Sequence, residues 1–260
     1  MPLKFGAVLD RRSITKENLE KLKSLGFDGV ELFIGEPSEQ NVKPIAETVK
    51  PLLGDGFQVS DIFASGVDLV RVALDELESV YIRCRQAFEA ARLLETSIVL
   101  LPVFRTPPGV DRATVLAKAS AALKRLDGLA SEYGVRLALE PLNRYETNIL
   151  KTMSETLRFL ENLGCENVKT MADLYHMSIE EAWIPDALRL ISGYLVHMHV
   201  SENHGGIPGT GTLPYPQVMR TLKEVGYDGF MSIEFHKGYP DVMEAYGRSL
   251  KYLKALADVV

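Results

Sequence analysis

Cysteine and tryptophan are scarce in this 260-residue sequence, which contains two cysteines and one tryptophan. Cys84 and Cys165 stand far apart and fit no metal-binding spacing, so we expect reduced thiols of a cytosolic protein and no disulfide framework. Long apolar runs are missing as well. The most continuous one, "SIVLLPVF" at 97–104, is far shorter than the ~20 residues of a membrane span. The opening residues, "MPLKFGAVLDRRS", have no apolar signal core, so we predict a cytoplasmic protein with no membrane partner.

Clustered positive charge is also missing. The formal net charge is −6, and no run of the sequence is dense in lysine or arginine. Because binding to a phosphate backbone depends on such a surface, we predict no nucleic-acid partner. No linker or low-complexity tract interrupts the chain, and its 46% hydrophobic content is enough for one large core. We therefore predict a single domain over residues 1–260.

Short apolar segments rich in β-branched residues alternate with longer segments of helical periodicity. Eight strands are predicted, at 4–9, 29–34, 57–63, 97–103, 135–140, 168–173, 194–200 and 230–234. Helices are predicted at 15–26, 41–53, 79–94, 114–134, 154–164, 184–191 and 216–226, and from 241 onward. Thr15 and Ser154 stand where helix N-caps are expected.

Near-continuous apolar strands that alternate with amphipathic helices are typical of a parallel sheet covered by helices. Eight such units predict an α/β fold of the (β/α)8, or TIM, barrel type. A doubly wound open sheet is the alternative. That fold usually has fewer strands and a glycine-rich phosphate turn after the first one, where this sequence has "LDRRS". The barrel is therefore the favoured prediction.

Four residues of metal-ligand type fall at the carboxyl ends of four consecutive predicted strands: Glu140, Asp173, His199 and Glu234. In a (β/α)8 barrel these ends carry the active site. Buried carboxylates that converge there repel one another unless a cation lies between them. Oxygen-rich ligation with one nitrogen suits Mn²⁺, Mg²⁺ or Co²⁺, so we predict one divalent metal ion.

Each of these residues, taken singly, has a structural alternative. Glu140 and Glu234 could be ion-pair partners, and Asp173 could cap the helix that follows it. His199 lies on the same strand face as His197, and a lone buried histidine is more often a hydrogen-bonded core residue than a ligand. Their common position at one end of four strands favours the metal site.

Several motifs at these positions resemble one known family. They are "EPLNRYET" after the fifth strand, "MADLYHMSIEE" at the sixth, "HMHVSENHGGIPGTGT" at the seventh and "SIEF" at the eighth. The sequence resembles the D-tagatose 3-epimerase-like ketose 3-epimerases of the xylose isomerase-like barrel superfamily. The resemblance is strong over about residues 135–235. The first half of the sequence matches only in its alternation of strands and helices.

The resemblance implies that Glu140 and Glu234 both bind the metal and transfer protons on opposite faces of a sugar. It also implies an enediolate intermediate, and members are often homodimers or homotetramers. Among the three candidate metals, Mn²⁺ is the first choice, with Mg²⁺ and Co²⁺ as alternatives. Glu146 and His176 match substrate-binding residues of the family. Ser65, in the loop after the third strand, and His204 are further candidates for sugar contacts. Arg144 is expected to be a structural ion-pair partner, with Asn143 holding the turn.

One position departs from the family pattern. The family usually has a substrate-binding arginine six residues after the histidine of the seventh strand, where this sequence has Gly205. A glycine offers no side-chain donor, so His204, His236 or Lys237 is expected to take over that contact.

Because of this departure, other functions stay open. An aldose–ketose, hydroxypyruvate or inosose isomerase would use the same metal site and move the proton elsewhere. A non-catalytic sugar-binding protein is a further alternative, although it would need neither glutamate. A phosphodiester-cleaving endonuclease of the superfamily is disfavoured, since its metal cluster needs more histidines than the five present and a basic surface.

Overall fold

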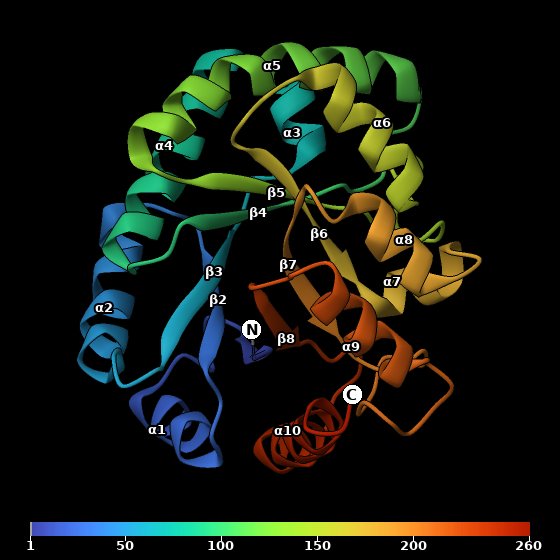
Figure 1. The fold of residues 1–260 in the computed structure, drawn as a ribbon. Helices are drawn as coiled ribbons and strands as arrows, with labels where there is room; N and C mark the ends of the chain where they lie inside the picture. Colours follow the sequence, from blue (N-terminus) through green and yellow to red (C-terminus); the bar gives the residue numbers. More distant parts are fainter. Residues whose placement is uncertain (1) are drawn as a thin grey trace.

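The computed structural model describes residues 2–260, and its eight parallel strands close into one barrel (Figure 1). Each strand pairs with the next along the chain, and β1 also pairs with β8, which closes the ring. The strands are β1 (Lys4–Leu9), β2 (Gly29–Gly35), β3 (Gln58–Ala64), β4 (Ile98–Pro102), β5 (Arg136–Glu140), β6 (Val168–Asp173), β7 (Leu195–Val200) and β8 (Phe230–Ile233). The predicted fold class is confirmed.

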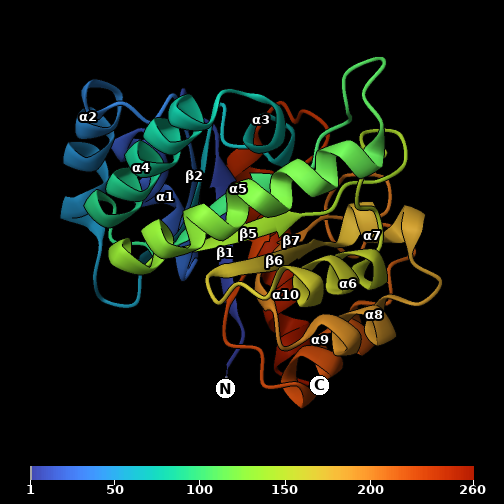
Figure 2. The same cartoon turned by 90° about the horizontal axis from the view of Figure 1, so that it is seen from above.

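Helices surround the barrel, and Figure 2 shows the longest of them, α5, crossing in front of β5 with α3 beside it. The helices are α1 (Lys16–Leu25), α2 (Glu39–Val49), α3 (Leu69–Leu74), α4 (Leu77–Leu93), α5 (Arg112–Tyr133), α6 (Met153–Leu163), α7 (Leu174–Glu180), α8 (Ile184–Ile191), α9 (Tyr215–Glu224) and α10 (Val242–Ala257). A short 3₁₀ helix, Lys50–Leu52, extends α2. Among the helices of residues 2–260, none combines the length and the apolar character needed to cross a membrane.

Two helices were not predicted from the sequence. The helices α3 and α7 have six and seven residues, too few to show a clear helical periodicity. The predicted N-cap Ser154 is also wrong. Thr152 is the N-cap of α6, because its backbone is extended and its side chain accepts a hydrogen bond from the N–H of Glu155. Thr15 caps α1 as predicted.

The barrel interior changes from apolar to polar along its axis. A separate cluster of buried apolar side chains comes from β4, β5 and β6. Its members are Ile98, Leu100, Ala138 and Met171. Because side chains alternate along a strand, Ala138 and Glu140 face the same side of the sheet, as do Met171 and Asp173. The strands therefore place an apolar layer below the polar residues at their carboxyl ends.

Candidate metal centre and active-site cavity

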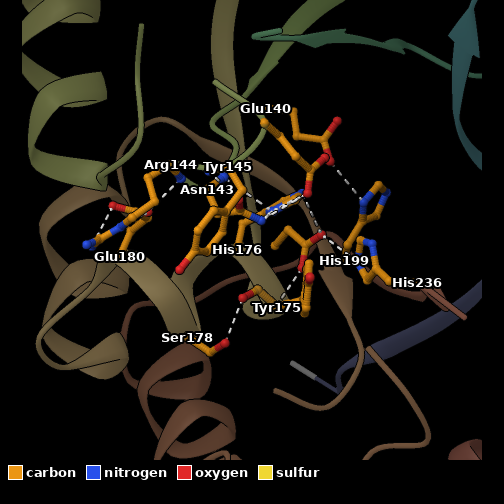
Figure 3. A network of polar contacts seen from close by, with 12 residues as sticks. Glu140, Asn143, Arg144, Tyr145, Tyr175, His176, Ser178, Glu180, His199 and His236 are labelled. Carbon is orange, nitrogen blue, oxygen red and sulfur yellow. Dashed lines mark hydrogen bonds and ion pairs between the residues drawn. The ribbon is translucent and has the colours of Figure 1, made fainter. Parts of the chain in front are cut away.

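The four predicted ligands come together. Ligand atoms of Glu140, Asp173, His199 and Glu234 all lie within 4.8 Å of one another. Strand register explains why these residues lie at the same height in the barrel. Asp173 pairs with His199, and His199 pairs with Ser232, two residues before Glu234. The Nδ1 atom of His199 lies 3.0 Å from Glu234 Oε2 and 3.4 Å from Glu140 Oε1. Figure 3 shows Glu140 and His199 facing one another across this centre.

The charges of these residues shift the pKa values of their neighbours. Burial lowers the pKa of His199, but the charges of Glu31 and Glu234 outweigh burial and raise this pKa well above its usual range. Burial also raises the pKa of Glu140. Burial would raise the pKa of Glu234 too, but the charge of His199 lowers it overall. The carboxylates around His199 thus favour a positive charge at this centre.

A second layer of polar residues lies beneath His199, and the sequence analysis missed it. Glu31 of β2 is buried, and its Oε2 lies 2.7 Å from His199 Nε2 and 3.1 Å from His197 Nε2. His197 Nε2 also lies 3.2 Å from Asp61 Oδ1 on β3. Because Glu31 contacts Nε2, the ring of His199 turns Nδ1 toward the candidate metal centre. Carboxylates behind metal-binding histidines orient the ring in the same way. A carboxylate inside an otherwise apolar strand, as in "GVELFI" and "VSDIF", was the available signal.

The loop after β5 fixes the orientation of His176. The backbone N–H of Asn143 donates to His176 Nδ1 at 3.3 Å, and Asn143 Nδ2 lies 2.8 Å from the same atom. Because Nδ1 accepts, the ring proton lies on Nε2, which faces Asp173 Oδ2 at 3.6 Å. Asn143 also holds the turn through Tyr145 and contacts Glu146. This is the arrangement in Figure 3.

Arg144 has the structural role predicted for it. Its side chain pairs with Glu180 of α7 at 2.8 Å, and its backbone N–H donates to the same carboxylate at 2.6 Å. The pair joins the loop after β5 to α7, the helix that carries His176 (Figure 3).

A cavity of about 580 Å³ opens above the candidate ligands. Glu146, His176 and His236 line its polar side, while Phe33, Phe63 and Phe104 line an apolar side. The rings of Phe33 and Phe63 are stacked with centroids 4.6 Å apart. The volume falls within the usual range for small-molecule sites.

Two residues predicted to contact a sugar lie elsewhere. Ser65 and His204 are both exposed and are not among the residues that line the cavity. The backbone N–H of Ser65 donates to the carbonyl of Gly35. The ring of His204 lies between Thr210 and Lys237, with nitrogen distances of 3.2 Å to each.

The donor set fits a divalent cation. Asp173 Oδ2 and His199 Nδ1 are buried and have no hydrogen-bond partner within the described residues. Three carboxylates and one imidazole match the ligand preferences of Mn²⁺ and Mg²⁺.

Added Mn²⁺ should therefore stabilise the protein. At a free concentration 100 times Kd, mass action predicts about 2.7 kcal/mol, which corresponds to an increase in Tm of about 5–10 °C for a chain of this size. Thermal unfolding with and without Mn²⁺ measures the shift. The matched variant is Asp173→Asn, which keeps the side-chain oxygen that caps α7 and should lose most of the shift. An equal shift in both proteins would exclude Asp173 as a ligand.

The fold and the site together define a class: a (β/α)8 barrel with a candidate cation centre, lined by carboxylates and a histidine, at the carboxyl ends of its strands. Residues 19–256 match the family described as xylose isomerase-like TIM barrel, so the chain belongs to this family. The family predicted from the sequence motifs is thereby confirmed.

Relatives and solved structures agree with this assignment. The chain is 27% identical to D-psicose 3-epimerase of Agrobacterium fabrum over 228 residues, which cover 83% of this chain and 77% of that protein. It is also 27% identical to 3-dehydro-D-guloside 4-epimerase of Escherichia coli over 257 residues, covering 92% and 93%. A crystal structure of 3-keto-D-glucoside 4-epimerase from E. coli superimposes with a TM-score of 0.83 at 25% identity, covering 97% and 99%.

Proposed function

We propose that this protein is a divalent-metal-dependent sugar epimerase that inverts C3 of a free ketose. The observation that carries the proposal is that two carboxylates, Glu140 and Glu234, both lie within 3.4 Å of one imidazole nitrogen of His199 and both line the cavity. They come from β5 and from the end of β8, so they approach the cavity from different strands. Inversion next to a ketone needs such a pair of proton-transfer groups.

The reaction needs no oxidant or reductant. One carboxylate removes the proton from C3, and the electron pair of that C–H bond moves into an enediolate with the C2 carbonyl oxygen. The other carboxylate delivers a proton to the opposite face of C3, and the carbonyl forms again. Positioned acid–base groups of this kind contribute roughly 10²–10⁴-fold to the rate.

Glu140, Asp173, His199 and Glu234 would hold the metal, for which Mn²⁺ is our first choice. When bound, such a cation supplies Lewis-acid stabilisation of the negative charge that develops on the sugar oxygens. Glu146 and His176 line the cavity beside this centre, and we assign them to substrate binding. The Nε2–H of His176 is available to donate to a sugar oxygen.

A second candidate is epimerisation at C4 of a sugar oxidised at C3. The relative named as a 4-epimerase covers 92% of this chain, and its reaction also inverts a carbon next to a ketone. The same two carboxylates would serve. An aldose–ketose type of isomerase differs in that the proton moves between C1 and C2.

The position of solvent hydrogen in the product distinguishes these functions. The Mn²⁺-loaded protein is incubated in D₂O with D-psicose, D-fructose, D-tagatose, a 3-keto-glucoside and hydroxypyruvate, and NMR locates the deuterium. Deuterium at C3 with the C3 epimer supports the proposal, and deuterium at C4 supports the second candidate. Label at C1 or C2 with an aldose product would identify an isomerase. Sugar binding without exchange would identify a non-catalytic binding protein.

A further inference from the structure

Lys237, in the loop after β8, is the only lysine or arginine among the described residues that line the cavity. The acidic residues of the lining are Asp10, Glu31, Glu140, Glu146 and Glu234. Within residues 2–260 Lys237 nevertheless forms no ion pair, and Glu234, the nearest carboxylate in the sequence, pairs with two histidines instead. Lys237 is exposed, so it lies at the open side of the cavity. Its ammonium group is free to bind an oxygen atom of a ligand.

The loops after β7 and β8 pack closely, and two glycines make this possible. A Cβ atom at Gly205 would lie 2.7 Å from Cβ of His236, which is closer than such atoms approach in proteins. A Cβ atom at Gly206 would lie 2.6 Å from Nζ of Lys237 and 2.7 Å from Cε1 of His204. The backbone N–H of His236 donates to the Gly205 carbonyl at 3.0 Å. Lys237 and His204 therefore meet over the backbone of Gly206, where no side chain separates them.

Hydrogen bonds to both ring nitrogens determine the tautomer of His204. The hydroxyl of Thr210 donates its one proton to the carbonyl of Ile207 at 2.6 Å, so Nε2 of His204, 3.2 Å from the same hydroxyl oxygen, must be the donor to it. Nδ1 lies 3.2 Å from Nζ of Lys237, and an ammonium group can only donate. Nδ1 therefore accepts. The two contacts require the same neutral ring, and neither involves a candidate metal ligand.

Tyr239 holds the same loop on the other side of Lys237. Its hydroxyl accepts a hydrogen bond from the backbone N–H of Ile207 at 3.0 Å, and Nζ of Lys237 lies 5.8 Å from the centroid of its ring, within the range of a cation–π contact. The loop after β8 is thus attached to the loop after β7 both before and after Lys237. A lysine held in this way loses less side-chain freedom on binding than an isolated surface lysine does.

We propose that Lys237 is a substrate-binding residue and that His204 is the positioning residue that holds its ammonium group at the cavity. This inference rests on the proposed function. His204 engages one of the three N–H groups of Lys237, which leaves two N–H groups for hydroxyl oxygens of the sugar. Because Lys237 is exposed and the carboxylate of Glu140 is buried, we place this contact away from the carbon that loses its proton. Such a contact stabilises the ground state and the transition state equally, so it lowers KM and leaves kcat unchanged.

Removing the ammonium group tests the contact with the sugar. Lys237→Met keeps most of the length and volume of the side chain and removes its N–H groups. With D-psicose as substrate, we expect KM to rise about 10-fold, as for loss of a hydrogen bond to a charged group, and kcat to stay close to that of wild type. Mn²⁺ affinity, measured by calorimetry, should not change. An unchanged KM would show that Lys237 is an ordinary solvated surface residue, and a loss in kcat alone would place it at the reacting carbon. Either result would overturn the proposal.

A matched pair of variants at His204 tests the positioning role. His204→Leu removes the acceptor for Lys237, whereas His204→Asn places an amide oxygen near the position of Nδ1. We expect the leucine variant to reproduce part of the increase in KM and the asparagine variant to restore KM toward wild type. Combined with Lys237→Met, His204→Leu should cause no further increase, because it acts only through Lys237. Additive increases in KM, or equal increases in the two His204 variants, would overturn the role of His204.

A failure of the proposed function gives a different result, since wild type itself would then show no deuterium exchange with any sugar. In that case, calorimetry with D-psicose and the Mn²⁺-loaded proteins tests the contact directly. Weaker binding to Lys237→Met than to wild type would support the assignment of Lys237 as a sugar-binding residue. Equal binding, or no binding to either protein, would overturn it.

Discussion

Glutamine in place of Glu140 or Glu234 should abolish epimerisation while leaving the barrel folded. Each substitution removes one of the two proton-transfer groups and keeps an oxygen that can still contact a cation. We expect the rate to fall by about 10³-fold, within the range for loss of general acid–base catalysis. NMR of the sugar product and circular dichroism of the protein measure the two effects.

Residual proton exchange gives this prediction a sharper form. With one carboxylate left, a variant can still remove a proton from one epimer and return it to the same face. Each variant should therefore exchange deuterium into one epimer without inverting it, and the two variants should select opposite epimers. Assays at saturating Mn²⁺ control for weaker metal binding. Appreciable inversion by either variant would remove that glutamate from its assigned role.

Glu31→Gln should weaken metal binding without any direct contact with the metal. The Glu31 carboxylate lies 2.7 Å from Nε2 of His199, where it orients the ring and increases the basicity of Nδ1. A neutral amide of nearly the same shape removes the charge and keeps the packing. We expect Kd for Mn²⁺ to rise by about 10–100-fold, as measured by calorimetry or by the EPR signal of free Mn²⁺.

Glu202 offers a matched control at the same end of the barrel. It is fully buried, and its carboxylate accepts hydrogen bonds from the backbone N–H groups of Gly209 and Leu213 at 2.9 and 2.8 Å. Glu202→Gln should lower the free energy of unfolding by about 1–3 kcal/mol, because it weakens charge-assisted hydrogen bonds. Its Mn²⁺ affinity should stay near wild type. Equal losses of Mn²⁺ affinity in the two variants would show that Glu31 acts only through general stability.

The barrel and the four converging ligands could be predicted from the sequence because they follow from local periodicity. Alternating apolar strands and amphipathic helices indicate parallel strands, and parallel strands bring their carboxyl ends to one side. Glu140, Asp173, His199 and Glu234 needed only that rule. Arg144 was also expected to form an ion pair, but the sequence did not identify its partner Glu180, which lies 36 positions away on α7.

The remaining contacts were decided by the tertiary structure. Glu31 meets His199 from 168 positions away, and a distance across a barrel depends on strand register, which periodicity does not specify. The close contact between His236 and Gly205 depends on how the loops after β7 and β8 pack together. The paths of the loops also leave Ser65 and His204 outside the cavity lining. Strand ends are set by local pattern, whereas contacts between loops and across the barrel are set by packing of the whole chain.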